Sequence, residues 1–410
     1  MFELNLLAFT DIMKSLGGIL LAVGILLAMV TIHEFGHYIA GKLLGFKINE
    51  FSVGFGPAIF KKRSKKTGEL FALRIIPLGG YCAFDGEDEY EDEPKNIPEK
   101  TTEEPFAELV VNPEKMEKDE GRYALNEKKV DEDVYPEPKG ERFNEQPPWK
   151  RIIVLIAGAT MNYLLALVLL VTMFTCIGRP LYRVIKLPES KTATMAIDGS
   201  IEVGDIIEKI DGKNMYMITD YMDVLQGKKA GESVAVSVIR EGKSVEVTMT
   251  LQQDANFVNM SDTGTLLQTM GIASLHSTTV KPAFFEGIGN SFAYSFKLGE
   301  MVLRSLGELL TGKLGLEAVG GPITTIQVTS QAASSSLLSF LNIAGFIGVN
   351  LAVFNLLPIP ALDGCKVIFC IVEWIRKKPI NRKIETIIHL IGIVVLFGFA
   401  ILVDVLRFFI

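Results

Sequence analysis

Four long stretches of this chain contain no acidic or basic residue apart from a single histidine, while charged residues fill the segments between them. The stretches cover residues 17–32, 152–178, 337–362 and 387–403, and the histidine is His389 in the last. A helix rises about 1.5 Å per residue, so each stretch can cross about 30 Å of hydrocarbon, the first with the help of the residues around His33. The pattern predicts a polytopic α-helical membrane protein with four transmembrane helices.

Basic residues gather beside the ends of these stretches and predict their orientation. The clusters lie at residues 61–66, 150–151 and 376–383. Lys and Arg close to a span resist translocation, so we expect all three clusters on the cytoplasmic side. The N-terminus, residues 179–336 and the C-terminus would then lie outside. The first stretch has no basic leader and no small-residue cleavage site, so we expect it to be retained.

Two short apolar runs follow the first stretch, at residues 51–60 and 70–84, with a basic turn between them. They are rich in Phe, Val, Ile and Gly, which predicts a β-hairpin over residues 51–84 that lies against the membrane. The alternative is a hairpin packed on a soluble domain, for which the neighbouring sequence offers no candidate. Residues 85–148 come next and carry 22 acidic and 9 basic residues. This composition predicts a flexible acidic cytosolic segment, either a plain tether or a regulatory element.

Residues 179–282 show short β runs separated by turn signals. Two alternating strands flank Glu241 and Gly242, which predicts a hairpin. The strand, turn and helical stretch over residues 204–226 resemble a PDZ domain of the bacterial protease-associated kind. This resemblance implies an inserted extracytoplasmic PDZ-like α+β domain, whose groove either captures peptide or serves only as part of a spacer.

A helix with one charged face is expected directly after this domain. Its charges recur at steps of three and four residues, as Lys297, Glu300, Arg304 and Glu308. This spacing places them on one side of a helix whose other side is apolar, and it predicts an interfacial amphipathic helix. The alternative is that the charged face packs against the PDZ-like domain.

The chemistry is concentrated in the sequence His33-Glu34-Phe35-Gly36-His37, at the inner part of the first stretch. Positions i and i+4 share a helix face, so both imidazoles can bind one Zn²⁺ while Glu34 lies beside a water molecule on the metal. Two histidines and a carboxylate are costly in hydrocarbon unless they pair or bind a metal. The motif therefore predicts a catalytic zinc site with Glu34 as the general base.

A third protein ligand is required, and two residues compete for this role. Asp363 follows the third apolar stretch after Pro358 and Pro360, at a depth that matches the histidines. An aspartate there can complete a tetrahedron with water in the fourth position. His389, at the inner end of the fourth stretch, is the rival. The four cysteines form no Cys-x-x-Cys pair, so we expect neither a cysteine zinc site nor a disulfide framework.

Taken together, these motifs resemble the site-2 protease family of zinc intramembrane metalloproteases, in particular the bacterial regulator-of-sigma-E protease type. The resemblance rests on His33 to His37, on the run from Asn355 to Gly364, on Ala157, Gly158 and Asn162, and on the PDZ-like segment. It implies that His33, His37 and Asp363 bind zinc and that Asn355, Pro358 and Pro360 shape the substrate channel. Asn355 has an alternative role in a hydrogen bond between helices. Cys365 and Ala159 stand where the family often has glycine and proline, which affects local geometry and removes no functional group.

The expected organisation then runs through eight parts: a first transmembrane helix with the zinc motif (1–50), a membrane-associated β-hairpin (51–84), the acidic segment (85–148), a second transmembrane helix (149–178), the PDZ-like domain (179–282), an amphipathic helix and loop (283–336), a third transmembrane helix with the third-ligand motif (337–375) and a fourth transmembrane helix (376–410).

The resemblance implies regulated intramembrane proteolysis in a bacterial cytoplasmic membrane, with the active site near the cytoplasmic side. The expected partners are the lipid bilayer and single-span membrane proteins already cut once outside, such as anti-sigma factors or signal-peptide remnants, and no nucleic acid. Two alternatives are a catalytically inactive zinc-binding scaffold, which the intact Glu34 disfavours, and a metal transporter, which the His-Glu-x-x-His spacing disfavours.

Overall fold

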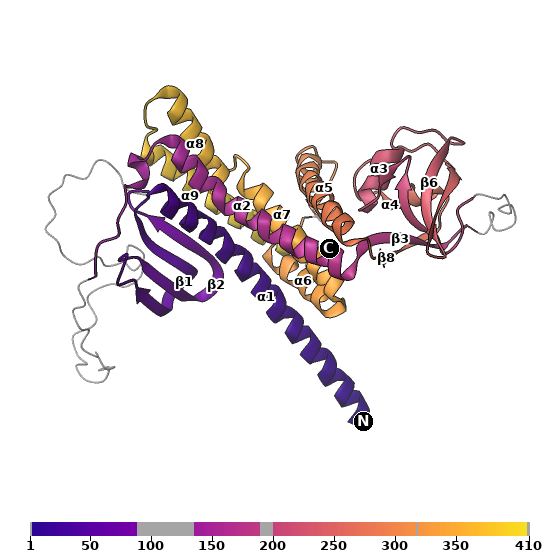
Figure 1. Cartoon of the computed structure of the whole chain (residues 1–410), viewed down its shortest axis with the longest axis horizontal. Helices are drawn as coiled ribbons and strands as arrows, with labels where there is room; N and C mark the ends of the chain where they lie inside the picture. The colour runs from indigo at the N-terminus through magenta and orange to yellow at the C-terminus, as the bar shows by residue number, and fades with distance from the viewer. Residues whose placement is uncertain (1, 88–134, 189–199, 317–318, 408–410) are drawn as a thin grey trace.

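The computed structural model describes residues 2–87, 135–188, 200–316 and 319–407, and the structural statements below refer to these ranges. Within them, four helices are long and apolar enough to span a membrane (Figure 1). They are α1 (Phe2–Leu44, with its span at Leu16–Leu44), α2 (Pro148–Thr172, continued by a π-helical turn at Met173–Ile177), α7 (Leu337–Asn355) and α9 (Arg382–Arg407). The predicted class of a four-helix membrane protein with added β-structure is confirmed.

Helix α2 is the central element of the bundle, because α1, α5, α7 and α8 all pack against it. Its buried residues Leu170 and Phe174 belong to one apolar core with residues of α5 and α7. Small residues allow close approach: a Cβ at Gly348 of α7 would lie 2.8 Å from Cβ of Ala166. Many apolar side chains point outward instead, Val168 among them. A bundle surrounded by lipid is expected to have such an apolar exterior.

The predicted hairpin is present as β1 (Ile48–Arg63) and β2 (Leu70–Phe84). Both strands bend, so that parts of each strand pair on two sides. Residues 50–53 pair with residues 80–83 on one side and with residues 70–73 on the other, while residues 58–63 pair with residues 70–74. Gly54 and Gly56 have φ angles of +86° and +80°, which allow β1 to bend between these halves. Ile59, Phe60 and Ile75 are exposed on this sheet, which suits a surface in contact with lipid.

The chain beyond the sheet is described in part. Residues 88–134 of the expected acidic segment lie outside the described residues. Residues 135–147 had been expected to share the flexibility of that segment, but they pack against the bundle. Phe143, in a short 3-10 helix (Phe143–Glu145), is buried against Phe46 and Phe84, and Glu141 forms a β-bridge with Phe46. The aromatic contacts fix this stretch on the bundle, because each buried phenylalanine side chain contributes about 1.5–3 kcal/mol to stability.

The inserted domain is a six-stranded antiparallel sheet with two short helices. The strand order is β7-β6-β4-β3-β8, with β5 paired to β4. The elements are β3 (Arg179–Lys186), β4 (Ile206–Ile210), β5 (Lys213–Asn214), α3 (Ile218–Leu225), β6 (Ser233–Arg240), β7 (Lys243–Thr250), α4 (Thr263–Met270) and β8 (Ser274–Val280). The predicted turn at Glu241 and Gly242 is confirmed: both have positive φ angles, and Arg240 pairs with Lys243. Since the first strand β3 pairs with the last strand β8, the chain enters and leaves this PDZ-like domain at one side, next to α2 and α5 (Figure 1).

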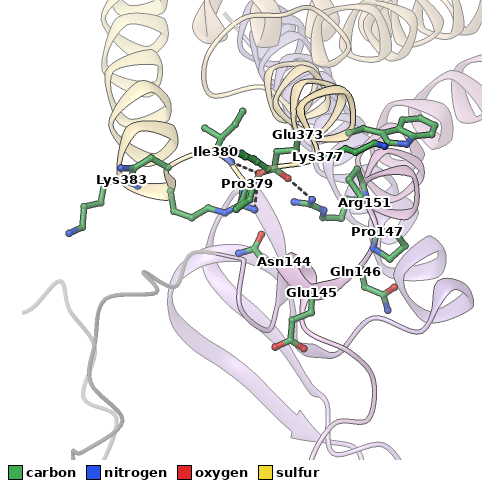
Figure 2. Close-up of a pocket in the computed structure, with 15 residues that line it drawn as sticks. Asn144, Glu145, Gln146, Pro147, Arg151, Glu373, Lys377, Pro379, Ile380 and Lys383 are labelled. Atoms are coloured by element: carbon green, nitrogen blue, oxygen red, sulfur yellow. Dashed lines mark hydrogen bonds and ion pairs between the residues drawn. The ribbon is translucent and has the colours of Figure 1, made fainter.

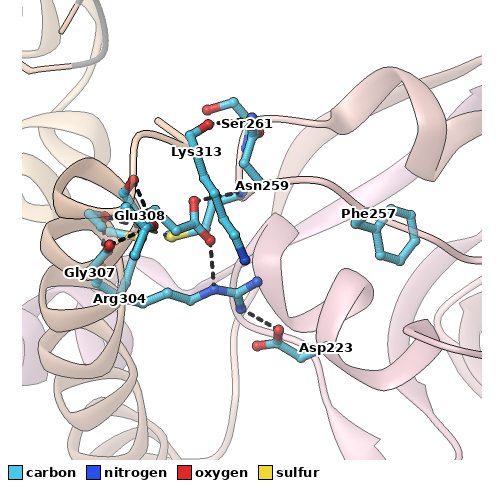
Figure 3. Close-up of polar contacts among 12 residues, drawn as sticks. Asp223, Phe257, Asn259, Ser261, Arg304, Gly307, Glu308 and Lys313 are labelled. Atoms are coloured by element: carbon cyan, nitrogen blue, oxygen red, sulfur yellow. Dashed lines mark hydrogen bonds and ion pairs between the residues drawn. The ribbon is translucent and has the colours of Figure 1, made fainter. Parts of the chain in front are cut away.

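Helix α5 (Phe284–Leu310) follows the domain, and its charged face packs on the PDZ-like domain. Nζ of Lys297 lies 2.8 Å from Oδ1 of the buried Asp220. Arg304 forms ion pairs with Asp223 and Glu308 (Figure 3). The structure therefore has the alternative arrangement for this face, in place of the expected interfacial helix. Burial lowers the pKa of Lys297, but the hydrogen bond to Asp220 and the attraction of the nearby carboxylates together outweigh burial, so the pKa of Lys297 is raised overall. The ion pairs of Lys297 with Asp220 and of Arg304 with Asp223 hold the domain against the membrane bundle, whereas the pair of Arg304 with Glu308 lies within α5.

Helix α6 (Pro322–Ser335) occupies a segment that was expected to be a loop. Its N-terminus is capped from a distant part of the chain: the carboxylate of Asp404 in α9 accepts hydrogen bonds from the backbone N–H of Ile323 at 2.8 Å and of Thr324 at 3.2 Å. Two of the orphan N–H groups of the helix are satisfied in this way. The cap also joins α6 to the last membrane helix.

The third membrane helix is shorter than expected. Helix α7 ends at Asn355, and the chain then turns through residues 356–362 before α8 (Asp363–Arg376) begins. Pro358 and Pro360 cannot continue a helix, because proline lacks the N–H and clashes with the preceding turn. Ala361 adopts a φ of +81°, and its N–H donates to Nδ1 of His389 at 3.1 Å. The break places Asp363 in the first turn of a new helix, where its side chain can turn toward α1.

Candidate metal centre

Three side chains from two distant parts of the chain converge inside the bundle. Nε2 of His33 lies 3.1 Å from Nε2 of His37, since both belong to one face of α1. Oδ2 of Asp363, from the start of α8, lies 3.1 Å from the first nitrogen and 3.4 Å from the second. These three atoms form a compact group that can hold a metal ion.

Their spacing fits zinc. Zinc bonds of about 2.0–2.1 Å in a tetrahedron place neighbouring ligand atoms about 3.3 Å apart. The observed separations of 3.1–3.4 Å agree with this value. Two imidazole lone pairs and a carboxylate oxygen repel one another at such distances unless a cation lies between them. A group of three protein ligands also leaves a fourth position open, as in catalytic zinc sites.

Helix α2 makes room for the two imidazoles. A Cβ at Gly158 would overlap Nε2 of His37 and would lie 2.8 Å from Cε1 of His33. On the opposite helix, a Cβ at Gly36 would overlap the carbonyl oxygen of Ala157 and lie 2.8 Å from the carbon of that group. Glycine at both positions therefore brings α1 and α2 into backbone contact at the level of the site.

Hydrogen bonds from neighbouring helices orient both rings. Nδ1 of His37 lies 2.8 Å from the carbonyl oxygen of Val154, which fixes Nδ1–H as the donor and leaves Nε2 as the ligand atom. Nδ1 of His33 lies 3.3 Å from the side-chain amide of Asn162 and 3.4 Å from that of Asn355. In both cases the amide nitrogen is the atom nearer to Nδ1; with either amide turned by 180°, its oxygen would accept Nδ1–H of His33 and leave Nε2 as the ligand atom. Asn355 of α7 thus contacts the candidate ligand His33 of α1. The alternative role considered from the sequence, a hydrogen bond between helices, is of this kind.

Glu34 lies on the neighbouring face of α1, toward the sheet. A Cβ at Gly80 of β2 would lie 3.2 Å from Cγ of Glu34, so β2 runs directly beside this side chain. No hydrogen bond from a described residue reaches its carboxylate. In β2, residues 80–83 pair with β1 on one side only, which leaves the other edge without a partner strand among the described residues.

The remaining sequence candidates have other contacts. His389 is absent from the three-residue group and instead accepts the N–H of Ala361, so it holds the turn before Asp363. Pro360 of the same turn packs against α9, where a Cβ at Gly392 would lie 2.5 Å from Cβ of Pro360. Pro358 is exposed in that turn. Sequence reasoning missed the oriented contact at Val154 and the space left by Gly158, because neither carries a chemical signature of its own.

Comparison with known proteins decides the family. The model of the family described as "Peptidase family M50" matches residues 21–399. The chain belongs to peptidase family M50. The regulator of sigma-W protease RasP of Bacillus subtilis is 28% identical, over 89% of this chain and 92% of that protein. A putative zinc metalloprotease of Clostridium perfringens is 30% identical, over 92% of this chain and 94% of that protein.

This M50 protein is therefore a RasP-like zinc metalloprotease and a multi-pass membrane protein. A solved PDZ domain, from the SdrC-like protein of Listeria monocytogenes, is 20% identical with a TM-score of 0.16, and the match covers 22% of this chain and 84% of that one. Zn²⁺ is the metal of this M50 protein, in agreement with the residue types and the spacing of the group formed by His33, His37 and Asp363.

Proposed function

We propose that this M50 protease cuts single-span membrane proteins within or beside the bilayer, after a first cut on the outer side has shortened them. The observation that carries this proposal is the position of the ligand group between membrane helices: two ligands lie on the spanning helix α1, and the third begins a helix directly after the span α7. A site at this depth meets peptide bonds that are in the membrane. Anti-sigma factors and signal-peptide remnants belong to this substrate class.

Each residue has a defined role in the proposed reaction. His33, His37 and Asp363 would hold Zn²⁺, which would supply Lewis acidity toward the scissile carbonyl and toward the attacking water. Glu34 accepts the proton of the attacking water and then delivers it to the leaving amine. The carbonyl oxygen of Val154 keeps His37 in the tautomer that binds metal, and Asn162 lies against Nδ1 of His33.

The sheet supplies a place for the substrate backbone. A helical substrate hides its carbonyl groups in its own hydrogen bonds, so the segment that is cut has to unwind. The open edge of β2 beside Glu34 can accept such a segment as an added strand and satisfy its backbone groups. Asn355, Pro358 and Pro360 lie around the break before Asp363 and would form the facing wall of the channel.

The orientation proposed for the membrane follows the basic clusters. The basic turn of the sheet, the start of α2 and the segment between α8 and α9 would face the cytoplasm, and the PDZ-like domain would lie outside. His33 and His37 are in the half of the span of α1 nearer the sheet. In this orientation the active site would lie near the cytoplasmic side. The ion pairs of Lys297 and Arg304 would hold the outer domain over the bundle, where it excludes substrates with large external parts.

The test compares Glu34→Gln with the natural protein on a purified single-span substrate in liposomes. The amide keeps the shape of the side chain but cannot accept a proton, so cleavage should fall by about 10²- to 10⁴-fold or more. Zinc per protein should stay unchanged. Glu246→Gln, the same change on an exposed strand of the PDZ-like domain, is the matched control and should cut normally. Cleavage retained by Glu34→Gln with zinc bound would contradict the proposed role.

A further inference from the structure

A cavity of about 750 Å³ opens at the end of the bundle where α2 and α9 begin (Figure 2). Its walls come from the stretch before α2, from the end of α8 and from the segment leading into α9. It is separate from the metal centre, which lies at the opposite end of α8. The volume is within the range of small-molecule sites, about 300–1,000 Å³.

The cavity has an excess of positive charge. Five basic residues line it against two acidic ones: Arg151, Lys377, Lys378, Arg382 and Lys383 against Glu145 and Glu373. The carboxylate of Glu373 is already engaged, with Arg151 at 2.5 Å, with Arg382 at 3.1 Å and with the N–H of Ile380 at 3.0 Å. Lys377 and Lys378 are exposed and form no ion pair with a described residue. The cavity therefore attracts an anion.

Arg151, which lines this cavity, has two buried donors without a partner among the described residues. Its side chain is 5% exposed, and only Nη2 is engaged, by Glu373. Nε and Nη1 are buried and have no hydrogen-bond partner among the described residues. Buried N–H groups without a partner are costly, and more so when they are charged. Figure 2 shows the guanidinium between Glu373 and Asn144, on the wall of the cavity. An acceptor oxygen that enters the cavity would satisfy these donors after a small turn of the guanidinium.

The surroundings indicate the source of such an anion. Arg151 lies in the first turn of one membrane span and Arg382 is the first residue of another, so the cavity is level with the headgroups of a bilayer. Trp374, 57% exposed, is on its wall, and tryptophan is enriched at this level of a membrane. The first turn of α2 contains no acidic residue and has no side-chain cap, which adds to the positive potential.

We propose that this cavity binds the phosphate group of an anionic phospholipid headgroup. The phosphate accepts hydrogen bonds from Arg151 and forms ion pairs with Lys377 and Lys378, while the acyl chains extend along α2 and α9 into the bilayer. Free phosphate shares the recognition chemistry but lacks the acyl chains. The site does not depend on the protease reaction, and its test does not use cleavage.

The experiment uses the fluorescence of Trp374 in the full-length protein in detergent. The chain has two tryptophans, so Trp149→Phe leaves Trp374 as the reporter. This protein is titrated with dioctanoyl phosphatidylglycerol, with dioctanoyl phosphatidylcholine as the zwitterionic lipid and with inorganic phosphate. We expect a saturable change with phosphatidylglycerol alone at low concentration. Replacing Lys377 and Lys378 by glutamine should weaken that binding about thirtyfold.

Two exposed lysines of the sheet provide the matched control. Lys61→Gln with Lys62→Gln removes the same charge from the same end of the molecule, and binding should change less than about twofold. Equal weakening by both lysine pairs, or equal binding of phosphatidylcholine, would overturn the site. Phosphate that saturates in the same range as the lipid would assign the cavity to free phosphate and reject the lipid. A third outcome would also overturn the proposal: Trp374 does not respond to phosphatidylglycerol, but its fluorescence changes when residues 88–134 are deleted. The acidic segment would then be the occupant of the cavity.

Discussion

Replacing Gly158 by alanine tests whether the two imidazoles share one metal ion. The new Cβ would lie 2.6 Å from Cε1 of His37 and 2.8 Å from Cε1 of His33, and it would overlap Nε2 of His37. Ordinary carbon contacts are about 3.5–4.0 Å, so the rings have to move by about 1 Å. Metal–ligand distances tolerate only about 0.2 Å. The substitution therefore acts on the ligand atoms although it changes no ligand.

Zinc affinity gives the magnitude of this effect. Changes in the residues that merely support metal ligands cost about 10- to 100-fold in affinity, and a displaced ligand costs at least the upper value. We expect Gly158→Ala to bind zinc at least about a hundredfold more weakly, measured by competition with a chelator and by metal content after purification. Gly24→Ala is the matched control, because a Cβ at that position of α1 meets no atom within 4 Å. Unchanged zinc affinity in a folded Gly158→Ala protein would refute the geometry described for the centre.

Three further changes test the ligand set, the orientation and the outer domain. Asp363→Ala should lose zinc and activity, whereas His389→Ala should keep zinc, with its binding weakened only indirectly through the turn at Ala361. The metal content of the two purified proteins is measured, and the reverse result would make His389 the ligand. A membrane-impermeant thiol reagent on intact cells should label Ser244→Cys and miss Ser64→Cys in a cysteine-free protein, and the opposite labelling would invert the orientation. The double change Lys297→Met and Arg304→Met should loosen the PDZ-like domain and raise cleavage of untrimmed substrates relative to trimmed ones. The control double change Lys213→Met and Lys243→Met should leave this ratio unchanged. An equal loss of cleavage of both substrates would contradict a size filter.

The sequence was sufficient for the features that repeat locally. Charge-free stretches predict the spans, because hydrocarbon excludes charge over a known thickness. His33 and His37 are placed on one face by helix geometry alone. Asp363 could be selected by its depth, since few ionisable residues lie at that level. The turn of β6 and β7 follows from Glu241 and Gly242, because their positive φ angles match a tight hairpin.

Features that depend on distant partners could not be predicted in this way. Helix α6 is rich in Thr and Ser, which are poor helix formers, and it is capped by Asp404, which is 81 residues away from Ile323. The folding back of β1 onto both halves of β2 depends on the bend at Gly54 and Gly56. From the sequence, Pro358 and Pro360 could either kink a continuous helix or end it at Asn355. The hydrogen bond between Ala361 and His389, which holds the turn after α7, favours the helix end.

The partners of the other polar side chains indicate why Glu34 is suited to chemistry. A charged group in hydrocarbon is costly unless it pairs, binds a metal or caps a helix. Arg151 and Glu373 pair, Asp404 caps α6, and the three candidate ligands face one another. Each of these groups has a structural partner, so its removal costs stability as well as function. Glu34 accepts no hydrogen bond from a described residue and lies beside the open edge of β2. A carboxylate kept in that position without a structural partner is available to a water molecule and a substrate, and its replacement by glutamine should therefore reduce activity while leaving stability unchanged.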